Sequence, residues 1–91
     1  MRTRLSPEQV RIRLSEMTGW GLAGDAIRRR YVFANFKESM AFVNRVAELA
    51  ERADHHPDIL VEYSKVTLTL RTHDAAGLTD VDFALARSID A

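Results

Sequence analysis

Three histidines are the residues of this sequence best suited to proton transfer, and they fall in two short motifs. His55 and His56 stand side by side before Pro57, and His73 follows seventeen residues after His56. An unperturbed imidazole titrates nearer to neutrality than any other side chain, so a histidine cluster favours general acid and base catalysis. The functional interpretation therefore depends on whether the fold brings the two motifs together.

The composition predicts one small domain that binds neither nucleic acids nor membranes. The chain has 91 residues, and its 13 basic and 13 acidic side chains give a formal net charge of zero, which argues against broad contact with phosphates or anionic lipids. The absence of cysteine excludes disulfides and thiolate metal sites, and no apolar run approaches the length of a membrane span. We therefore expect a single cytoplasmic domain over residues 1–91.

A glycine-rich segment at residues 19–24 matches the G-x-G-x-x-G pattern of dinucleotide-binding proteins. That pattern binds pyrophosphate only between a strand and a helix, whereas here a helical segment precedes it and an alternating, strand-like segment follows. We interpret residues 20–22 and 26–33 as two strands joined by a turn. The arginines at positions 28–30 are then solvated charges on an open sheet face or edge, rather than a phosphate site.

Capping residues mark the start of the first and last helices. The first helix, at about residues 7–17, begins after Ser6, and Gln9 can reach back to complete a capping box. The last helix begins at Thr79, where Asp82 stands in the corresponding position. Asp82 therefore has a structural role to set against any functional one.

The middle helix, predicted over residues 36–53, has two adjacent apolar stripes that together cover about half of its circumference. A helix that packs only on one sheet needs a narrower apolar surface than this. Either another helix of the same chain or the same helix of a second subunit could cover the second stripe. The stripes consist of Phe36, Met40, Val43, Ala47 and Ala50, and of Phe42, Val46, Leu49 and Ala53.

Alternating segments at about residues 59–63 and 66–71 predict a β-hairpin with a two-residue turn at Ser64-Lys65. Extended along the ladder, the register set by this turn places His56 opposite His73. Directly opposed side chains have Cβ atoms about 5 Å apart, so the two imidazoles would meet on the open face of the sheet. The full order of elements is α-β-β-α-β-β-α. It predicts an α+β fold, a four-stranded antiparallel sheet with three helices on one face.

These motifs together resemble the pterin-4a-carbinolamine dehydratases, also called the dimerisation cofactor family. The resemblance covers nearly the whole chain, and its H-H-P and T-H-x-x-x-G-L motifs are jointly specific at this spacing. It implies homodimers or homotetramers in which the long helix packs against its counterparts, and so favours the interface for the second stripe. The residues that carry the resemblance are Trp20, Ile27, Phe33, Phe36, Phe42, Val46, Ala47, Ala50, Glu51, His55, His56, Pro57, Tyr63, Val66, Leu70, Thr72, His73, Gly77, Leu78 and Asp82.

The resemblance implies a hydro-lyase of tetrahydrobiopterin recycling that needs neither a metal nor a redox cofactor. Its reaction would dehydrate 4a-hydroxytetrahydropterin, which an aromatic amino acid hydroxylase leaves behind, to quinonoid dihydropterin and water. His56 and His73, the predicted facing pair, would handle the hydroxyl and the N5 proton, and His55 would bind or assist. Three further positions are expected to contact the substrate: Asp82, Trp20 and Pro57.

Two other interpretations compete with the enzyme. Three histidines near carboxylates could bind zinc, but the adjacent His55 and His56 point in divergent directions, so we expect no metal. The resemblance also includes members that stabilise dimers of a homeodomain transcription factor, so a non-catalytic binding module is the alternative function. Retention of all three histidines favours the enzyme. For Trp20, core packing is at least as good an explanation as contact with a pterin.

Overall fold

The computed structural model describes residues 2–91 and confirms the expected order of elements. It contains three helices, four strands and one short 3-10 helix. Their bounds are α1 Pro7–Ser15, β1 Gly21–Ala23, β2 Ala26–Val32, α2 Phe36–Ala53, β3 Asp58–Glu62, β4 Lys65–Leu70, η1 His73–Ala75 and α3 Asp80–Asp90.

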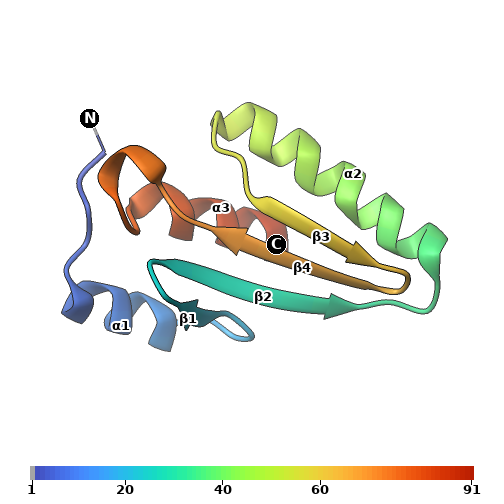
Figure 1. Ribbon diagram of the computed structural model, residues 1–91, viewed down its shortest axis with the longest axis horizontal. Helices are drawn as coiled ribbons and strands as arrows, with labels where there is room; N and C mark the ends of the chain where they lie inside the picture. The colour runs from blue at the N-terminus through green and yellow to red at the C-terminus, as the bar shows by residue number, and fades with distance from the viewer. Residues whose placement is uncertain (1) are drawn as a thin grey trace.

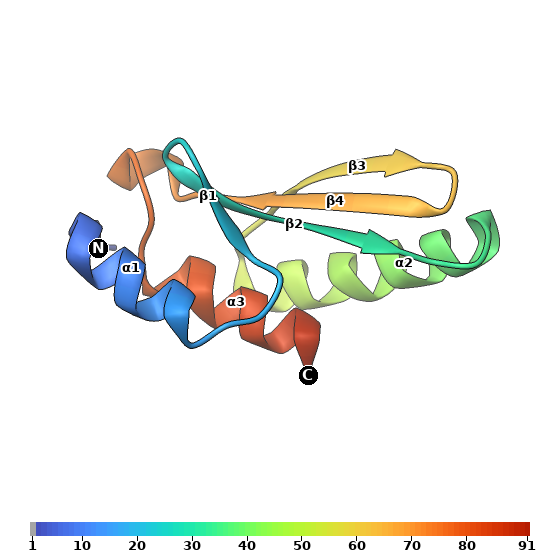
Figure 2. The same ribbon diagram turned by 90° about the horizontal axis from the view of Figure 1, so that it is seen from below.

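The four strands form one antiparallel sheet in the order β1-β2-β4-β3, so β1 and β3 are its edges (Figure 1). All three helices lie on the same side of this sheet and leave its other face open, as the α+β prediction requires (Figure 2). The core lies between the two layers. Its completely buried side chains come from the two central strands and from α2 and α3, and include Ile27, Val46, Val66, Leu68, Leu70 and Phe83.

The first helix begins with the predicted capping box. The Ser6 hydroxyl accepts from the backbone N–H of Gln9, and the Gln9 side chain accepts from the backbone N–H of Ser6. The helix ends at Ser15, two residues before the expected end. Ahead of the cap, the backbone N–H of Leu5 donates to the carbonyl of Leu78 at 2.7 Å, which fixes the N-terminal segment beside the start of α3.

Helix α2 has the predicted bounds, and its C-terminal cap directs the chain into the candidate site. Asp54 adopts the left-handed conformation, with φ of 50°, so the helix stops before the histidines and His55 turns inward. Val46 and Ala50 are buried, whereas Phe36 at the start of the helix is 50% exposed. Part of the predicted apolar surface is therefore left uncovered by this chain.

The predicted turn of the second hairpin is wrong by one position, and the strand register by two. The two residues between the strands are Tyr63 and Ser64, and Val61 rather than Tyr63 lies opposite Val66. Because side chains alternate between faces, a two-residue shift leaves each of them on the same face. The apolar alternation is therefore equally compatible with both registers, and it could not distinguish them.

The expected cross-strand pairing of His56 with His73 is wrong for the same reason and for a second one. Strand β3 begins only at Asp58, after His56, and β4 ends at Leu70, before His73. His73 lies instead in η1, within a loop that a bridge between Thr72 and Gly77 closes. The ladder therefore extends to neither histidine, and any joint action of the two must come from other contacts.

The glycine-rich segment has the structural role expected of it, whereas the prediction for the arginine run is wrong at Arg29. Residues 21–23 form β1 and are followed by a tight turn into β2. Arg28 and Arg30 are exposed on the open face of the sheet, while Arg29 points to the other side and pairs with Asp90 at 3.1 Å. No helix in the described part of the chain is long and apolar enough to cross a bilayer.

Candidate active site

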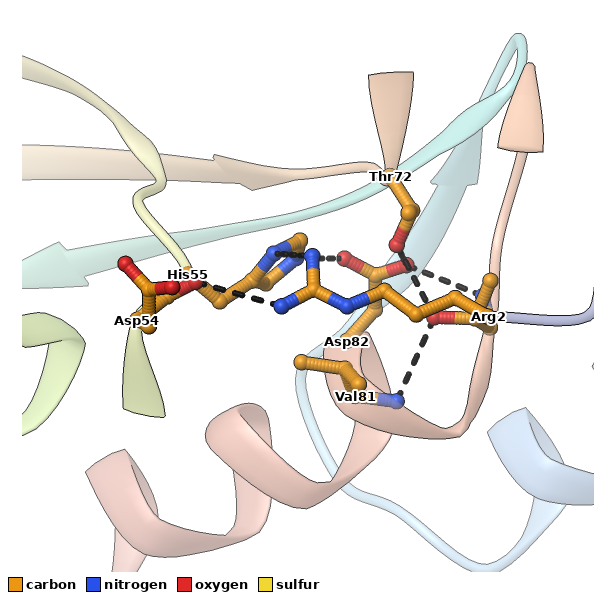
Figure 3. A network of polar contacts seen from close by, with 7 residues as sticks. Arg2, Asp54, His55, Thr72, Val81 and Asp82 are labelled. Carbon is orange, nitrogen blue, oxygen red and sulfur yellow. Dashed lines mark hydrogen bonds and ion pairs between the residues drawn. The ribbon is translucent and has the colours of Figure 1, made fainter. Parts of the chain in front are cut away.

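The centre of the candidate site is the carboxylate of Asp82, which is completely buried in the first turn of α3. One oxygen, Oδ2, accepts from the backbone N–H of Thr79 at 3.0 Å and from the Thr72 hydroxyl at 2.8 Å. The other oxygen, Oδ1, lies 2.5 Å from Nε2 of His55 (Figure 3). Asp82 therefore completes the predicted capping box and, with the same side chain, holds an imidazole.

Two threonine hydroxyls extend this network in one direction. The Oγ1 atoms of Thr72 and Thr79 are 2.9 Å apart, and Thr79 Oγ1 also accepts from the backbone N–H of Val81 at 3.3 Å. A carboxylate has no proton to give, so Thr72 donates to Asp82 and Thr79 donates to Thr72. Within residues 2–91, no buried side-chain nitrogen or oxygen lacks a hydrogen-bond partner. The network is thus fully satisfied, which favours one rigid arrangement.

The partners of His55 determine which of its nitrogens carries the proton. Its side chain is 6% exposed, and its Nδ1 lies 3.1 Å from Nη1 of Arg2. A guanidinium can only donate, so Nδ1 accepts and the proton of the neutral imidazole is on Nε2, facing Asp82. Arg2 and Asp82 together therefore fix both the tautomer and the orientation of the ring.

The other two histidines flank this network at the surface. His56 is 58% exposed, and its Nε2 lies 2.5 Å from Oε2 of Glu51 in the last turns of α2. His73 is exposed and directly follows Thr72, whose hydroxyl belongs to the network. In the described chain no side chain hydrogen-bonds to His73 or to Nδ1 of His56, so these nitrogens can reach a ligand. The two motifs are thus linked through Asp82, not through the hairpin ladder.

The structure places the remaining two candidate residues differently. Pro57 follows His56 directly and is half-buried at the entrance to β3. Trp20 is 7% exposed, and its indole N–H donates to Asp90 at 2.8 Å, at the opposite end of α3 from the site carboxylate. Eight residues of helix separate the two ends by about 12 Å along the axis. Trp20 is therefore not brought together with the histidines.

Some contacts of this site were not indicated by the sequence. Arg2 lies 53 positions from His55 and belongs to no periodic segment, so no sequence signal pointed to it. Thr72 could have been found, because it is the polar residue directly before His73. Among the described residues, no group of three histidine, aspartate or glutamate side chains is close enough together to hold a metal ion.

The fold and the site define a small α+β protein in which a buried histidine–aspartate pair lies beside two exposed histidines. Residues 3–91 match the family model described as Pterin 4 alpha carbinolamine dehydratase. The chain therefore belongs to the pterin-4a-carbinolamine dehydratase family, as the sequence motifs indicated.

Individual relatives agree with this assignment. Proteins provisionally named pterin-4-alpha-carbinolamine dehydratases share 56% identity in Thermomicrobium roseum (94% of this chain, 92% of the relative) and 49% in a Picosynechococcus species (99% and 98%). A crystal structure of a transcriptional coactivator/pterin dehydratase from Brucella melitensis superimposes with a TM-score of 0.93 at 32% identity, over 97% of this chain and 96% of that one. A pterin dehydratase-like RuBisCO assembly factor of the alpha-carboxysome shares the fold, with a TM-score of 0.65 at 24% identity over 78% and 82% of the two chains.

Proposed function

We propose that this protein dehydrates 4a-hydroxytetrahydropterin to quinonoid dihydropterin and water. Membership of the family supports a pterin substrate. The observation that carries the proposal is the Asp82 network, because one buried carboxylate contacts His55 of the first histidine motif and Thr72 of the second. A buried, fully hydrogen-bonded arrangement of this kind holds the two motifs together, and the exposed His56 and His73 directly follow His55 and Thr72 of that network.

The proposed reaction requires two proton transfers and no change in oxidation state. The bond between C4a and the hydroxyl oxygen breaks, and the oxygen takes up a proton and leaves as water. The N5–H bond also breaks, and its electron pair forms the double bond between N5 and C4a. One group that donates a proton and one that accepts a proton are therefore sufficient for the chemistry.

The contacts of the three histidines support a division of roles. Both ring nitrogens of His55 have hydrogen-bond partners, Asp82 and Arg2, so neither is free to transfer a proton. We therefore assign His55 to binding and orientation of the substrate. His56 and His73 each keep a nitrogen that can reach the substrate, and we assign the acid and the base to these two.

The direct test follows the breakdown of freshly generated 4a-hydroxytetrahydropterin with and without the purified protein. We expect acceleration by the parent and a loss of roughly 10²- to 10⁴-fold in His56→Ala and in His73→Ala, the usual contribution of a general acid or base. Equal rates with and without the protein would refute the enzymatic proposal.

A matched pair of glutamates tests the role of the His56 contact. Glu51 and Glu48 lie on exposed turns of α2, but only Glu51 has His56 as a partner among the described residues. We expect Glu51→Gln to lower the turnover number about 10-fold, because loss of the charged partner leaves the imidazole less well oriented. Glu48→Gln should match the parent. Equal turnover in the two variants would show that this contact does not serve catalysis.

The alternative function is that of a non-catalytic, protein-binding or dimer-stabilising module. The uncovered apolar surface of α2, with Phe36 50% exposed, supports it, and so does the similarity to the transcriptional coactivator/pterin dehydratase of Brucella melitensis. The same surface supports our proposal that the chain forms homodimers or homotetramers through α2. Sedimentation of the parent and of Phe36→Glu tests the association. A monomeric parent would refute it.

The cellular setting belongs to the same proposal. We also propose that the protein acts in the cytoplasm, where a hydroxylase supplies the substrate. The product, quinonoid dihydropterin, must then be reduced by a separate two-electron donor before the pterin can enter the next hydroxylation cycle. Purified hydroxylase, supplied with a thiol reductant for quinonoid dihydropterin, should then oxidise more substrate per pterin in the presence of the protein, and His73→Ala should abolish the gain.

A further inference from the structure

The segment before α1 crosses from the α1 side of the molecule to the histidine site. Its course is fixed by the hydrogen bond from the Leu5 N–H to the Leu78 carbonyl and by the Leu5 side chain, which packs against the core. From this anchor the chain reaches back so that the Arg2 guanidinium lies beside His55 (Figure 3). Nη1 donates to His55 Nδ1 at 3.1 Å, and Nη2 donates to the carbonyl oxygen of Asp54 at 3.2 Å.

The two acceptors that Arg2 contacts are each held by other parts of the protein. His55 is fixed through Nε2 by the buried carboxylate of Asp82. Asp54 is fixed by the end of α2, where its own N–H donates to the carbonyls of Ala50 and Glu51. Removal of the guanidinium would therefore leave a preformed pair of adjacent acceptors, one nitrogen and one oxygen, beside the two exposed histidines.

The chemistry of this acceptor pair selects a particular kind of ligand. Two neighbouring acceptors match a planar unit with two N–H donors on one carbon, which is what the guanidinium supplies. The aminopyrimidinone ring of a pterin has the same arrangement, because its 2-amino group and N3–H are attached to a guanidine-like carbon. Arg2 thus presents to the site the same donor pattern as that edge of the proposed substrate.

We propose that His55 Nδ1 and the Asp54 carbonyl bind the 2-amino and N3–H edge of the pterin, and that Arg2 is an internal competitor that the substrate displaces. This inference rests on the proposed pterin function and adds the orientation of the ligand to it. With the pyrimidine ring on His55 and Asp54, the other ring of the pterin, which carries N5, extends away from the acceptor pair. The reacting end is thereby assigned to the two exposed histidines, His56 and His73, which directly follow His55 and Thr72 in the chain.

An internal competitor lowers the apparent affinity of a ligand by the fraction of molecules in which it is displaced. Leu5 tethers Arg2 close to the site, so its two hydrogen bonds are favoured by a high effective concentration. Hydrogen bonds of this kind have modest net strength, so removing the guanidinium should tighten pterin binding roughly 3- to 10-fold.

Calorimetric titration with two probes tests the proposal. The probes are 7,8-dihydropterin and 7,8-dihydrolumazine, in which a carbonyl replaces the 2-amino group. Arg2→Met removes the donors, and Arg4→Met is the matched control in the same segment. We expect Arg2→Met to bind dihydropterin roughly 3- to 10-fold more tightly than the parent does. Arg4→Met should bind it as the parent does. Arg2→Met should bind dihydrolumazine at least about 10-fold more weakly than it binds dihydropterin. Unchanged or weaker dihydropterin binding in Arg2→Met would overturn the proposal, as would equal binding of the two probes.

A spectroscopic readout separates this inference from the proposed function. Imidazole ¹⁵N spectra should show a proton on Nε2 of His55 in the parent and in Arg2→Met. Addition of dihydropterin to the parent should shift the Arg2 guanidinium resonances, because the guanidinium leaves His55. Displacement and tighter binding without turnover of 4a-hydroxytetrahydropterin would refute the dehydratase alone. Turnover together with dihydropterin binding that is the same in the parent and in Arg2→Met would refute only the role of Arg2 as a competitor. Absence of binding by every variant would refute both proposals.

Discussion

Replacing Asp82 by asparagine should destabilise the protein far more than the same change two residues earlier, at Asp80. The Asp82 side chain is completely buried and accepts from three donors, whereas Asp80 is exposed and pairs with Arg13 at 2.6 Å. Both changes remove one negative charge from the first turn of α3. Their difference therefore isolates the contribution of the buried network from that of the helix dipole.

The expected loss in the free energy of unfolding follows from the hydrogen bonds that an asparagine side chain at position 82 cannot accept. Its amide oxygen can replace Oδ2, but its NH₂ group then faces the N–H of His55, so one charge-assisted hydrogen bond worth about 1.5–3 kcal/mol is lost. The two other hydrogen bonds become neutral, which costs about 1 kcal/mol more. We expect a total loss of about 3 kcal/mol in the free energy of unfolding, or roughly 12–24 °C in melting temperature. Asp80→Asn should cost about 0.5 kcal/mol.

Urea denaturation followed by circular dichroism measures both losses. The protomer concentration must be the same in every sample, because subunit association raises apparent stability. Thr72→Val should also cost less in the Asp82→Asn background than in the parent, since both changes act on one network. A difference below about 1 kcal/mol between Asp82→Asn and Asp80→Asn would refute the argument that three donors hold this carboxylate.

Three substitutions away from the histidines test other parts of the fold. Trp20→Phe should lower the free energy of unfolding by about 2 kcal/mol, because packing and the hydrogen bond to Asp90 are lost. Its pterin turnover should stay within about two-fold of that of the parent. A large loss of pterin binding would instead place Trp20 at the site. Burial, together with the hydrogen bond to Asp90, raises the pKa of Tyr31, so its neutral phenol contributes stability that is complete below about pH 10 and is lost as the pH rises above that value. Alkaline denaturation of Tyr31→Phe should therefore be less steep than that of the parent, and identical curves would contradict this cause. Tyr63 has φ of 55°, so Tyr63→Gly should stabilise the hairpin by about 1 kcal/mol in thermal melts, whereas Tyr63→Ala, which keeps the Cβ, should not.

Local patterns predicted most of the fold because they report local physics. The capping residues Ser6 and Thr79 marked the start of two helices correctly, since each satisfies backbone donors within its own first turn. The alternation of apolar residues identified the strands and the faces they bury. The same alternation could not set the hairpin register, because a shift of two residues exchanges no side chain between faces.

The candidate site was predicted in its composition but not in its arrangement. Asp82 was recognised first as a cap, and its second oxygen was then free to hold an imidazole from a distant segment. The sequence favoured His56 as the central histidine, whereas the left-handed cap at Asp54 turns His55 inward instead. The contact between Arg2 and His55 depends on the packing of an irregular segment, which has no periodicity to interpret.

Helix α3 joins the candidate site to two aromatic side chains at the opposite end of the helix. Its first turn carries Asp82, and its last turn carries Asp90, which accepts from the indole of Trp20 and the phenol of Tyr31. A helix of three turns is nearly a rigid rod. A molecule that binds His55 and shifts its partner carboxylate therefore also alters the contacts of the indole at the other end. The emission of the single tryptophan can thus register binding at a site that the indole does not touch.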